Sequence, residues 1–341
     1  MAFLEKALSL MTSVVNTMNS LPTEIQEAIE SMVEQIPQKS LIQALHSLSY
    51  AYREATQKQT LEQGLTDLQR LAYLACRLPA TYAALYAVFT HIQNILPHFR
   101  PQSMVDLGAG PGTASIVVRA FFESLNQILC IEGDPAFIEL GKKLLNTSVQ
   151  WQKQDLKDIY FHESFDLSVI SYALGELSDT TLMTVLNHAF TKTAGLLVLV
   201  EPGTPRGYAT LMRARDFLME KGAICVAPCP HQKPCPMNNQ TGKWCHFTTR
   251  LARSRLHRRL KEADLGFEDE PFSYLILMPQ NIASLPQYDR IVEAPQQRSG
   301  HIRFTICSHE GKIEESVISR RDACFKLAKK AEWGDVLPNK E

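Results

Sequence analysis

The sequence lacks the features of a secreted or membrane-spanning chain. No hydrophobic run approaches the ~18 residues needed to cross a bilayer, and the nearest one, residues 83–89, is far too short. The first sixteen residues contain only Glu5 and Lys6 as charged residues and no arginine, which fits neither a signal peptide nor a transit peptide. We therefore expect a cytoplasmic protein with no membrane partner.

The chain also lacks internal repeats and low-complexity tracts. Its 341 residues suggest about two domains, and 45% hydrophobic with 21% charged residues is typical of a globular chain with a full core. Residues 1–98 carry apolar residues at helical spacing, with one helix expected to end before Pro79, and predict an N-terminal helical domain. Residues 99–341 form the second predicted domain.

Strands and helices alternate in this second domain, which predicts a parallel sheet with helices on both faces. We expect seven strands: Met104–Leu107, Ile128–Ile131, Val149–Gln152, Phe165–Ile170, Gly195–Val200, Phe272–Leu277 and His301–Cys307.

A glycine loop follows the first predicted strand and opens a helix. The dinucleotide-binding pattern G-x-G-x-x-G is absent. Instead, Asp106 precedes Gly108, Gly110 and Gly112, whose spacing is G-x-G-x-G. Glycines let a ligand approach the backbone closely, and the helix N-terminus offers free N–H groups.

Two acidic residues are placed to complete this site. Glu132 ends the second predicted strand, where a carboxylate can accept both ribose hydroxyls, and Asp155 follows the third, where it can accept the adenine amino group. The loop, the acids and the strand order together resemble class I methyltransferases, an α/β fold that binds S-adenosylmethionine. The alternative is a nucleotide-binding fold with an empty pocket.

No catalytic residue is identifiable. The fourth predicted strand is followed by Ser171-Tyr172-Ala173-Leu174-Gly175-Glu176. This segment lacks the Asn/Asp-Pro-Pro-aromatic tetrad with which amino-nitrogen methyltransferases hold a target amine, so methylation of a base amine is disfavoured.

The eight cysteines are unevenly distributed. Cys225, Cys229, Cys235 and Cys245 fall within 21 residues, which indicates a metal centre rather than a disulfide framework. The spacings from Cys229 to Cys235 and on to Cys245 are wider than the C-x2-4-C knuckles of zinc fingers, so an iron–sulfur cluster is favoured over zinc.

Such clusters often take a fourth ligand from a distant segment. Cys307 is the best candidate, and His231 or His246 would be the alternative if the metal were zinc. The other cysteines lie in apolar patterns and are interpreted as buried hydrophobic residues: Cys76, Cys130, Cys225 and Cys324.

The net charge of −1 hides a basic segment at residues 206–261. This segment contains twelve Lys and Arg but only two acidic residues, Asp216 and Glu220. Its net charge is therefore +10, and that of the rest of the chain is −11. An excess of this size indicates a polyanionic partner. The densest group, Arg253, Arg255, Arg258 and Arg259, is the predicted RNA-binding set; the alternative is a solvated helix face.

The chain resembles the methyltransferase-like assembly factors of the mitochondrial small ribosomal subunit and their bacterial relatives, from about Tyr52 almost to the C-terminus. The markers, besides the loop at 106–113, are Leu71-Ala72-Tyr73-Leu74-Ala75-Cys76-Arg77-Leu78-Pro79-Ala80-Thr81-Tyr82, Glu201-Pro202-Gly203-Thr204, the Cys-Pro-His segment at Cys229, Trp244-Cys245-His246-Phe247, Phe272-Ser273-Tyr274-Leu275 and Trp333-Gly334-Asp335.

The resemblance implies a [4Fe–4S] cluster on Cys229, Cys235, Cys245 and Cys307, built into the methyltransferase fold within the basic insertion. It also implies association with small-subunit rRNA. The absence of an organellar presequence favours a bacterial member. Two functions fit: an S-adenosylmethionine-dependent rRNA methyltransferase, or a non-catalytic RNA-binding assembly factor that uses the fold as a scaffold.

Overall fold

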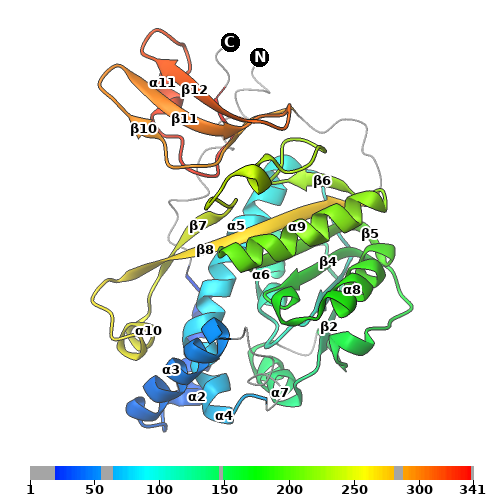
Figure 1. The fold of residues 1–341 in the computed structure, drawn as a ribbon. Helices are drawn as coiled ribbons and strands as arrows, with labels where there is room; N and C mark the ends of the chain where they lie inside the picture. Colours follow the sequence, from blue (N-terminus) through cyan, green and yellow to red (C-terminus); the bar gives the residue numbers. More distant parts are fainter. Residues whose placement is uncertain (1–19, 55–63, 146–148, 280–286, 339–341) are drawn as a thin grey trace.

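The computed structural model describes residues 20–54, 64–145, 149–279 and 287–338. Figure 1 shows a central mixed sheet with helices on both faces, helices at one end and a small second sheet at the other. The N-terminal helices are α2 (Thr23–Val33), α3 (Gln38–Glu54), α4 (Asp67–Ala72), the π-helical turn η1 (Tyr73–Arg77) and α5 (Leu78–Ile95).

The helix does not end at Pro79, contrary to the prediction. Proline has no N–H and clashes with the carbonyl four residues earlier in a regular α-helix. Here the turn before it widens, and the Leu78 N–H donates to the Tyr73 carbonyl, five residues back. The π-helical turn thus lets the chain continue into α5, with Pro79 in its first turn.

One helical stretch among the described residues, Asp67–Ile95, is long and apolar enough to span a membrane by those two criteria alone. Its most apolar window is 72% buried inside the protein, as in a core helix. The stretch packs against α6 (Thr113–Phe121) and against the edge of the sheet. The helical segment therefore shares a hydrophobic core with the sheet, and the division at residues 98 and 99 stays a prediction.

The central sheet has eight strands, and its main path runs β3-β2-β1-β4-β5-β8-β6. The first five of these are parallel and β8 is reversed, the order typical of class I methyltransferases. The strands are β1 (Ser103–Leu107), β2 (Gln127–Glu132), β3 (Gln150–Lys153), β4 (Phe165–Ser171), β5 (Thr193–Pro202), β6 (Ile224–Ala227), β7 (Phe247–Ala252) and β8 (Phe267–Met278).

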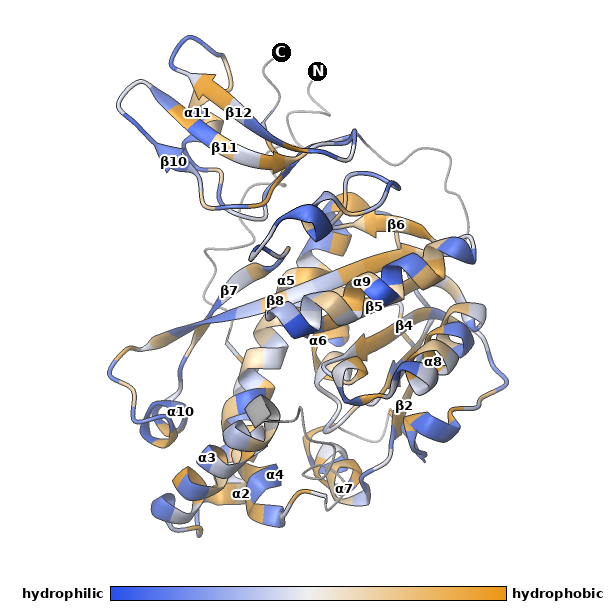
Figure 2. Ribbon diagram, viewed as in Figure 1, coloured by the Kyte–Doolittle hydropathy of each residue, from blue (hydrophilic) through white to orange (hydrophobic). Residues whose placement is uncertain are grey.

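Alternate residues of the strands face opposite cores. Met104 and Val169 point to the side covered by α5 and α6, whereas Val105 and Ile170 point to the side covered by α8 (Asp179–Thr191) and α9 (Pro205–Glu220). Figure 2 shows the resulting hydrophobic centre of the sheet, with β8 turning hydrophilic along the part that pairs with β7.

Strands β6 and β7 were not predicted. Both pair with the same side of β8, β6 near Met278 and β7 between Phe267 and Phe272. The cysteine-rich segment joins β6 to β7, and α10 (Arg255–Leu260) joins β7 to β8.

The predicted seventh strand is misplaced. His301–Cys307 is β11 of a separate sheet, where it pairs with β9 (Arg290–Ile291), β10 (Gln296–Gln297) and β12 (Ile313–Ser319). This sheet has its own small core with α11 (Phe325–Ala328). The apolar pattern of a strand does not reveal which sheet the strand joins, and in the central sheet the antiparallel strand next to β5 is β8.

Candidate cofactor loop and cysteine centre

The glycine loop lies at the carboxyl end of β1. Gly108, Gly110 and Gly112 have φ angles of 69°, 55° and 84°, in the left-handed region that favours glycine. A Cβ on Gly112 would lie 2.5 Å from Leu145, whereas one on Gly110 would meet no atom of the described residues within 4 Å. The loop backbone at Gly110 is therefore open to a ligand before the chain enters α6.

Glu132 ends β2 beside this loop. Its Oε2 accepts the Gly110 N–H at 2.7 Å and its Oε1 accepts the Asp134 N–H at 2.8 Å. Burial raises the pKa of the carboxyl, and the two backbone donors oppose that rise. Each oxygen keeps further lone-pair capacity, so the residue fits an acceptor for ribose hydroxyls.

The other two predicted acids lie differently. Asp106 is buried beneath the loop, 1% exposed, and neither of its oxygens has a hydrogen-bond partner of normal geometry among the described residues. Burial, with a smaller effect from Glu132, raises its pKa to about 8. Asp155 is exposed and caps a short 3-10 turn, η2 (Leu156–Asp158), by accepting the Lys157 N–H at 2.8 Å. Its Cα lies close to Gly133, at the end of β2.

Two further acids at this edge were missed. Glu201, the last residue but one of β5, is 2% exposed and accepts the Leu174 N–H at 2.9 Å, and burial raises its pKa to about 8. Burial and Glu132 raise the pKa of Glu176 to about 7. The signal was present for Glu201, since an acidic residue ends an otherwise apolar strand at the same edge as the loop.

The four predicted cysteine ligands line one small cavity of about 20 Å³. Cys229 follows β6, Cys235 precedes the turn η4 (Pro236–Asn239), Cys245 precedes β7 and Cys307 ends β11. The cavity is otherwise lined mainly by apolar residues, and none of its described lining residues is a histidine.

The thiols lie close enough to influence one another. Burial, then Cys229, Cys235 and Cys307, raise the pKa of Cys245. Tyr208 Oη lies 3.4 Å from Cys235 Sγ. As placed, no three Cys, His, Asp or Glu side chains of the described residues form a ready group of metal ligands. The donor set fits a four-thiolate centre, but closed coordination geometry is not present.

The two histidines lie around the cavity rather than on it. His231 Nε2 lies 3.4 Å from Cys307 Sγ, its Nδ1 accepts the Lys233 N–H, and burial lowers its pKa to about 4. His246 stacks on Trp244 and meets Trp333 edge-on. The remaining cysteines are buried, as predicted: Cys76, Cys130, Cys225 and Cys324.

A family model described as mitochondrial small ribosomal subunit Rsm22 matches residues 67–338. The chain belongs to the Rsm22 family. The human ribosome assembly protein METTL17, mitochondrial, is 26% identical over 330 residues, which cover 90% of this chain and 69% of that protein. The Saccharomyces cerevisiae ribosome assembly protein RSM22, mitochondrial, is 21% identical and covers 42% of this chain and 38% of its own length.

A Schizosaccharomyces pombe relative, Rsm22-cox11 tandem protein 2, mitochondrial, is 26% identical, and this Rsm22-family chain spans 44% of its length. Among solved structures, magnesium protoporphyrin IX methyltransferase from Synechocystis aligns with 70% of the chain and 97% of its own, at 12% identity and a TM-score of 0.38. Structural similarity at this level does not support an assignment, so the class I methyltransferase fold is assigned from the order and direction of the strands.

The expectation of a cytoplasmic, bacterial protein is wrong. It rested on the absence of a recognisable presequence, whereas the relatives named above are all mitochondrial proteins. A weak or unusual N-terminal pattern does not decide the compartment.

The basic segment of this Rsm22-family protein does not form one cationic surface. Five of its cations form close pairs with carboxylates, and a sixth, Arg215, lies 3.8 Å from Asp216. The close pairs are Arg213 with Asp179, Lys243 with Glu293, Arg250 with Asp269, and both Arg253 and Lys261 with Glu268. Arg253 is only 14% exposed, and its assignment to the RNA-binding set stays a prediction that this burial does not favour. The positive charge of Arg253 is balanced by the carboxylate of Glu268.

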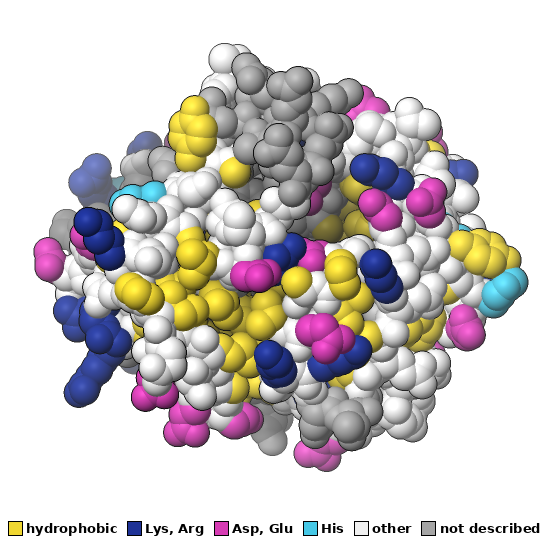
Figure 3. Space-filling model, turned by 90° about the horizontal axis from the view of Figure 1, so that it is seen from below, with side chains coloured by type: hydrophobic (Ala, Val, Ile, Leu, Met, Phe, Trp, Pro, Cys, Tyr) yellow, Lys and Arg dark blue, Asp and Glu magenta, His cyan; other side chains and the backbone are white. Residues whose placement is uncertain are grey.

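The other three predicted RNA-binding arginines lie on α10. Arg255, Arg258 and Arg259 are exposed and form no ion pair with a carboxylate of the described residues, although Arg258 donates to the Asp264 carbonyl. In Figure 3, Lys and Arg side chains gather at the left edge, the side on which α10 lies in Figure 1. Strand β7 lies between Cys245 and α10, and its five residue steps of about 3.4 Å place α10 at the far end of the strand, so these cations do not surround the cysteine centre.

Proposed function

We propose that this chain is an assembly factor of the small ribosomal subunit that binds rRNA and carries a [4Fe–4S] cluster on Cys229, Cys235, Cys245 and Cys307. The observation that carries the proposal is the meeting of these four cysteines, three from the β6–β7 segment and one from the second sheet, on one cavity. The family membership supports the ribosomal partner.

The cluster would act as a cross-link. Cys229, Cys235 and Cys245 belong to a segment with little regular structure, and Cys307 belongs to a different sheet. A metal centre bound to all four would supply folding energy to the segment and fix the second sheet against the first. Zinc on the same thiolates is the alternative, and it would do the same without sulfide.

The three arginines of α10 are the proposed contact with rRNA. They are the exposed part of a segment whose other cations are largely paired internally. Exposed arginines bind phosphate, and binding that releases counterions weakens with salt. The protein should co-sediment with small-subunit particles at low salt and dissociate at high salt; co-sedimentation that salt leaves unchanged would overturn this contact.

S-adenosylmethionine is the proposed ligand of the glycine loop. The open backbone at Gly110 and the adjoining Glu132 carboxylate support binding. Glu132 lies four strand spacings from β8, or about 19 Å, so the residues of this loop and those of the cysteine centre form separate sites.

Methyl transfer to rRNA is the second candidate function. The intact loop and Glu132 favour it, and the absent tetrad after β4 disfavours a base amine as acceptor. Transfer of a labelled methyl group to small-subunit particles would establish it. Binding of S-adenosylmethionine without transfer would leave the scaffold function.

A further inference from the structure

Two arginines are buried beside the cysteine cavity. Arg215, on α9, is 1% exposed, and Arg290, on β9, is 2% exposed. Arg290 stands opposite Cys307 in the pairing of β9 with β11, and it lines the cavity. The sulfurs of Cys229, Cys225 and Cys235 raise the pKa of Arg215, although its burial acts in the opposite direction.

The oxygen atoms that accept hydrogen bonds from Arg215 are both backbone carbonyls, and its guanidinium also lies beside the sulfurs of Cys225 and Cys229. Its Nη2 donates to the Lys233 carbonyl at 2.8 Å and, weakly, to the His231 carbonyl at 3.4 Å. Its Nε has no partner among the described residues. The nearest carboxylate oxygen, on Asp216, is 3.8 Å away on a side chain that is 58% exposed.

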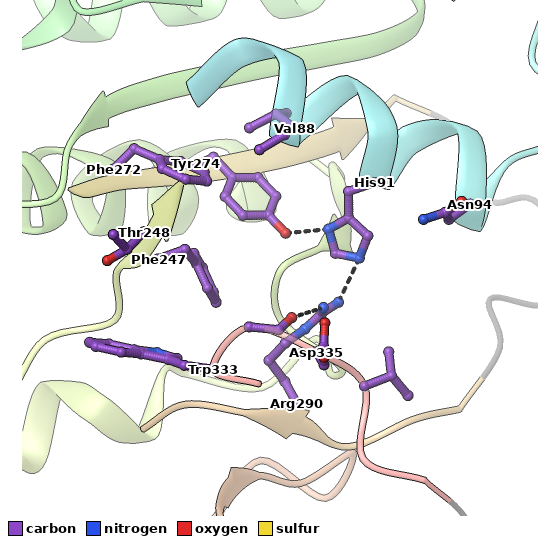
Figure 4. A pocket seen from close by; sticks show the side chains of 13 residues that line it. Val88, His91, Asn94, Phe247, Thr248, Phe272, Tyr274, Arg290, Trp333 and Asp335 are labelled. Atoms are coloured by element: carbon purple, nitrogen blue, oxygen red, sulfur yellow. Dashed lines mark hydrogen bonds between the residues drawn. The ribbon is translucent and has the colours of Figure 1, made fainter. Parts of the chain in front are cut away.

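Arg290, which lines the cavity, is also held by neutral groups. Figure 4 shows it between His91 and the segment that contains Trp333 and Asp335. It donates to the carbonyls of Pro228 and Gly334, and its Nη2 lies 3.1 Å from His91 Nε2. Burial, then Arg290, keeps the pKa of His91 well below its usual value, so the ring is neutral and accepts.

Asp335 is the acidic neighbour of Arg290, but the guanidinium forms no ion pair with a carboxylate of the described residues and donates to backbone carbonyls instead. Burial raises the pKa of Asp335 to about 6. A buried charge without a counter-charge is costly, since carbonyls only partly replace the lost solvation.

Four neutral thiols would not balance two guanidinium groups. Four thiolates around an oxidised cubane core would, because they bring four negative charges and the core returns two positive ones. The two arginines and such a centre have equal and opposite net charge.

We propose that Arg215 and Arg290 are the counter-charges of the cysteine centre, a role that rests on the proposed cluster. They stabilise the loaded protein and destabilise the metal-free one, where their charges are unbalanced. They also raise the reduction potential of the cluster, because reduction adds a negative charge that the guanidinium groups attract.

Arg215→Met tests this, since methionine fills a similar volume without charge. Arg213→Met is the matched control, because Arg213 lies on the same helix but is 45% exposed and paired with Asp179. Wild type and both variants are purified anaerobically, and part of each is stripped with a chelator. Urea unfolding of the loaded and stripped forms, iron and sulfide per chain, and the midpoint potential are then measured.

For Arg215→Met we expect a loaded form that is less stable than loaded wild type, a stripped form at least as stable as stripped wild type, and a lower midpoint potential. Arg213→Met should change neither the potential nor the difference between loaded and stripped stability. Arg215→Lys, which keeps the charge, should restore most of the potential, and Arg290→Met should act in the same direction as Arg215→Met.

Equal destabilisation of the loaded and stripped forms by Arg215→Met, with an unchanged potential, would show that the arginine only fills space. In that case the cluster itself stands, because the loaded wild type holds it. A wild-type protein without metal and sulfide would overturn the cluster and this role together.

Discussion

The Glu132 carboxylate is the proposed acceptor for the ribose hydroxyls of S-adenosylmethionine. Glu132→Ala should weaken binding of this ligand by about 1.5–3 kcal/mol, the range for a hydrogen bond with a charged partner. Isothermal calorimetry measures it, with Glu139→Ala as the control, because Glu139 is exposed on α7 (Pro135–Leu144) outside the loop. If Glu132→Ala and Glu139→Ala bound S-adenosylmethionine with equal affinity, Glu132 would not be part of the binding site.

Asp106→Asn should make stability less dependent on pH. The pKa of Asp106 is raised to about 8, whereas an unfolded aspartate titrates near ~4, so the folded state binds the proton more tightly. The free energy of unfolding of the wild-type protein therefore decreases as the pH rises from ~4 to about 8. At about 1.4 kcal/mol per unit, the variant should gain a few kcal/mol over wild type at pH 8 and little at pH 4. Urea unfolding showing the same gain at both pH values would contradict the buried, protonated Asp106.

Single residues of the site were predictable where chemistry and position coincide. An acid at the end of a strand next to a glycine loop indicated Glu132, and the structure places it on the Gly110 N–H. The burial of Arg253 was not predictable in this way, because a count of charges in the sequence does not reveal its ion pair with Glu268 on the next strand. The burial of Arg215 was not predictable from the sequence for the same reason, because it depends on how α9 packs.

At the scale of elements, the five parallel strands and the loop between β1 and α6 followed from alternation of pattern. The π-helical turn at η1 did not, because proline normally ends a helix and only packing selects the widened turn. The membership of His301–Cys307 in the second sheet was also inaccessible, since strand pairing depends on distant partners. Even so, the distant cysteine at its end was correctly placed near the other three.

The helix α10 carries the prediction on RNA. Arg255 and Arg259 lie four residues apart on one face, and both are exposed. Their joint reversal to glutamate should weaken co-sedimentation with small-subunit particles. It should also lower the slope of log affinity against log salt by about 0.7–0.9 for each phosphate that the protein no longer neutralises.

Lys142→Glu with Lys143→Glu is the control for this experiment. These residues are also exposed cations on a short helix, α7, so the change in net charge is the same. If both double variants weakened binding equally, the effect would be one of overall charge and α10 would not be the contact. Iron content should be unchanged in both, because α10 lies away from the cysteines.

The two sheets of the described part of the molecule meet at the cysteine centre and at the contacts of Arg290. Figure 1 shows the second sheet above the β6–β7 segment, and Figure 4 shows the C-terminal Trp333 and Asp335 reaching the pocket against α5 and β8. Loss of the centre should therefore loosen the second sheet while the methyltransferase core, with its own buried strands, stays folded.

Cys307→Ser tests this arrangement. Hydrogen exchange should become faster across β11 and β12, which only this cysteine would tie to the centre, while β1, β4 and β5 keep their protection. Cys324→Ser is the matched control, because Cys324 is buried in the same small sheet domain but does not line the cavity. Faster exchange in the core strands as well would mean that the two parts unfold together.

The central claim is that four cysteines hold a cubane cluster, and elemental analysis of anaerobically purified protein tests it most directly. We predict about four iron and four sulfide per chain in wild type and in Cys76→Ser, and their loss in Cys229→Ser, Cys235→Ser, Cys245→Ser and Cys307→Ser. Stoichiometric zinc without sulfide in the wild-type protein would contradict the claim.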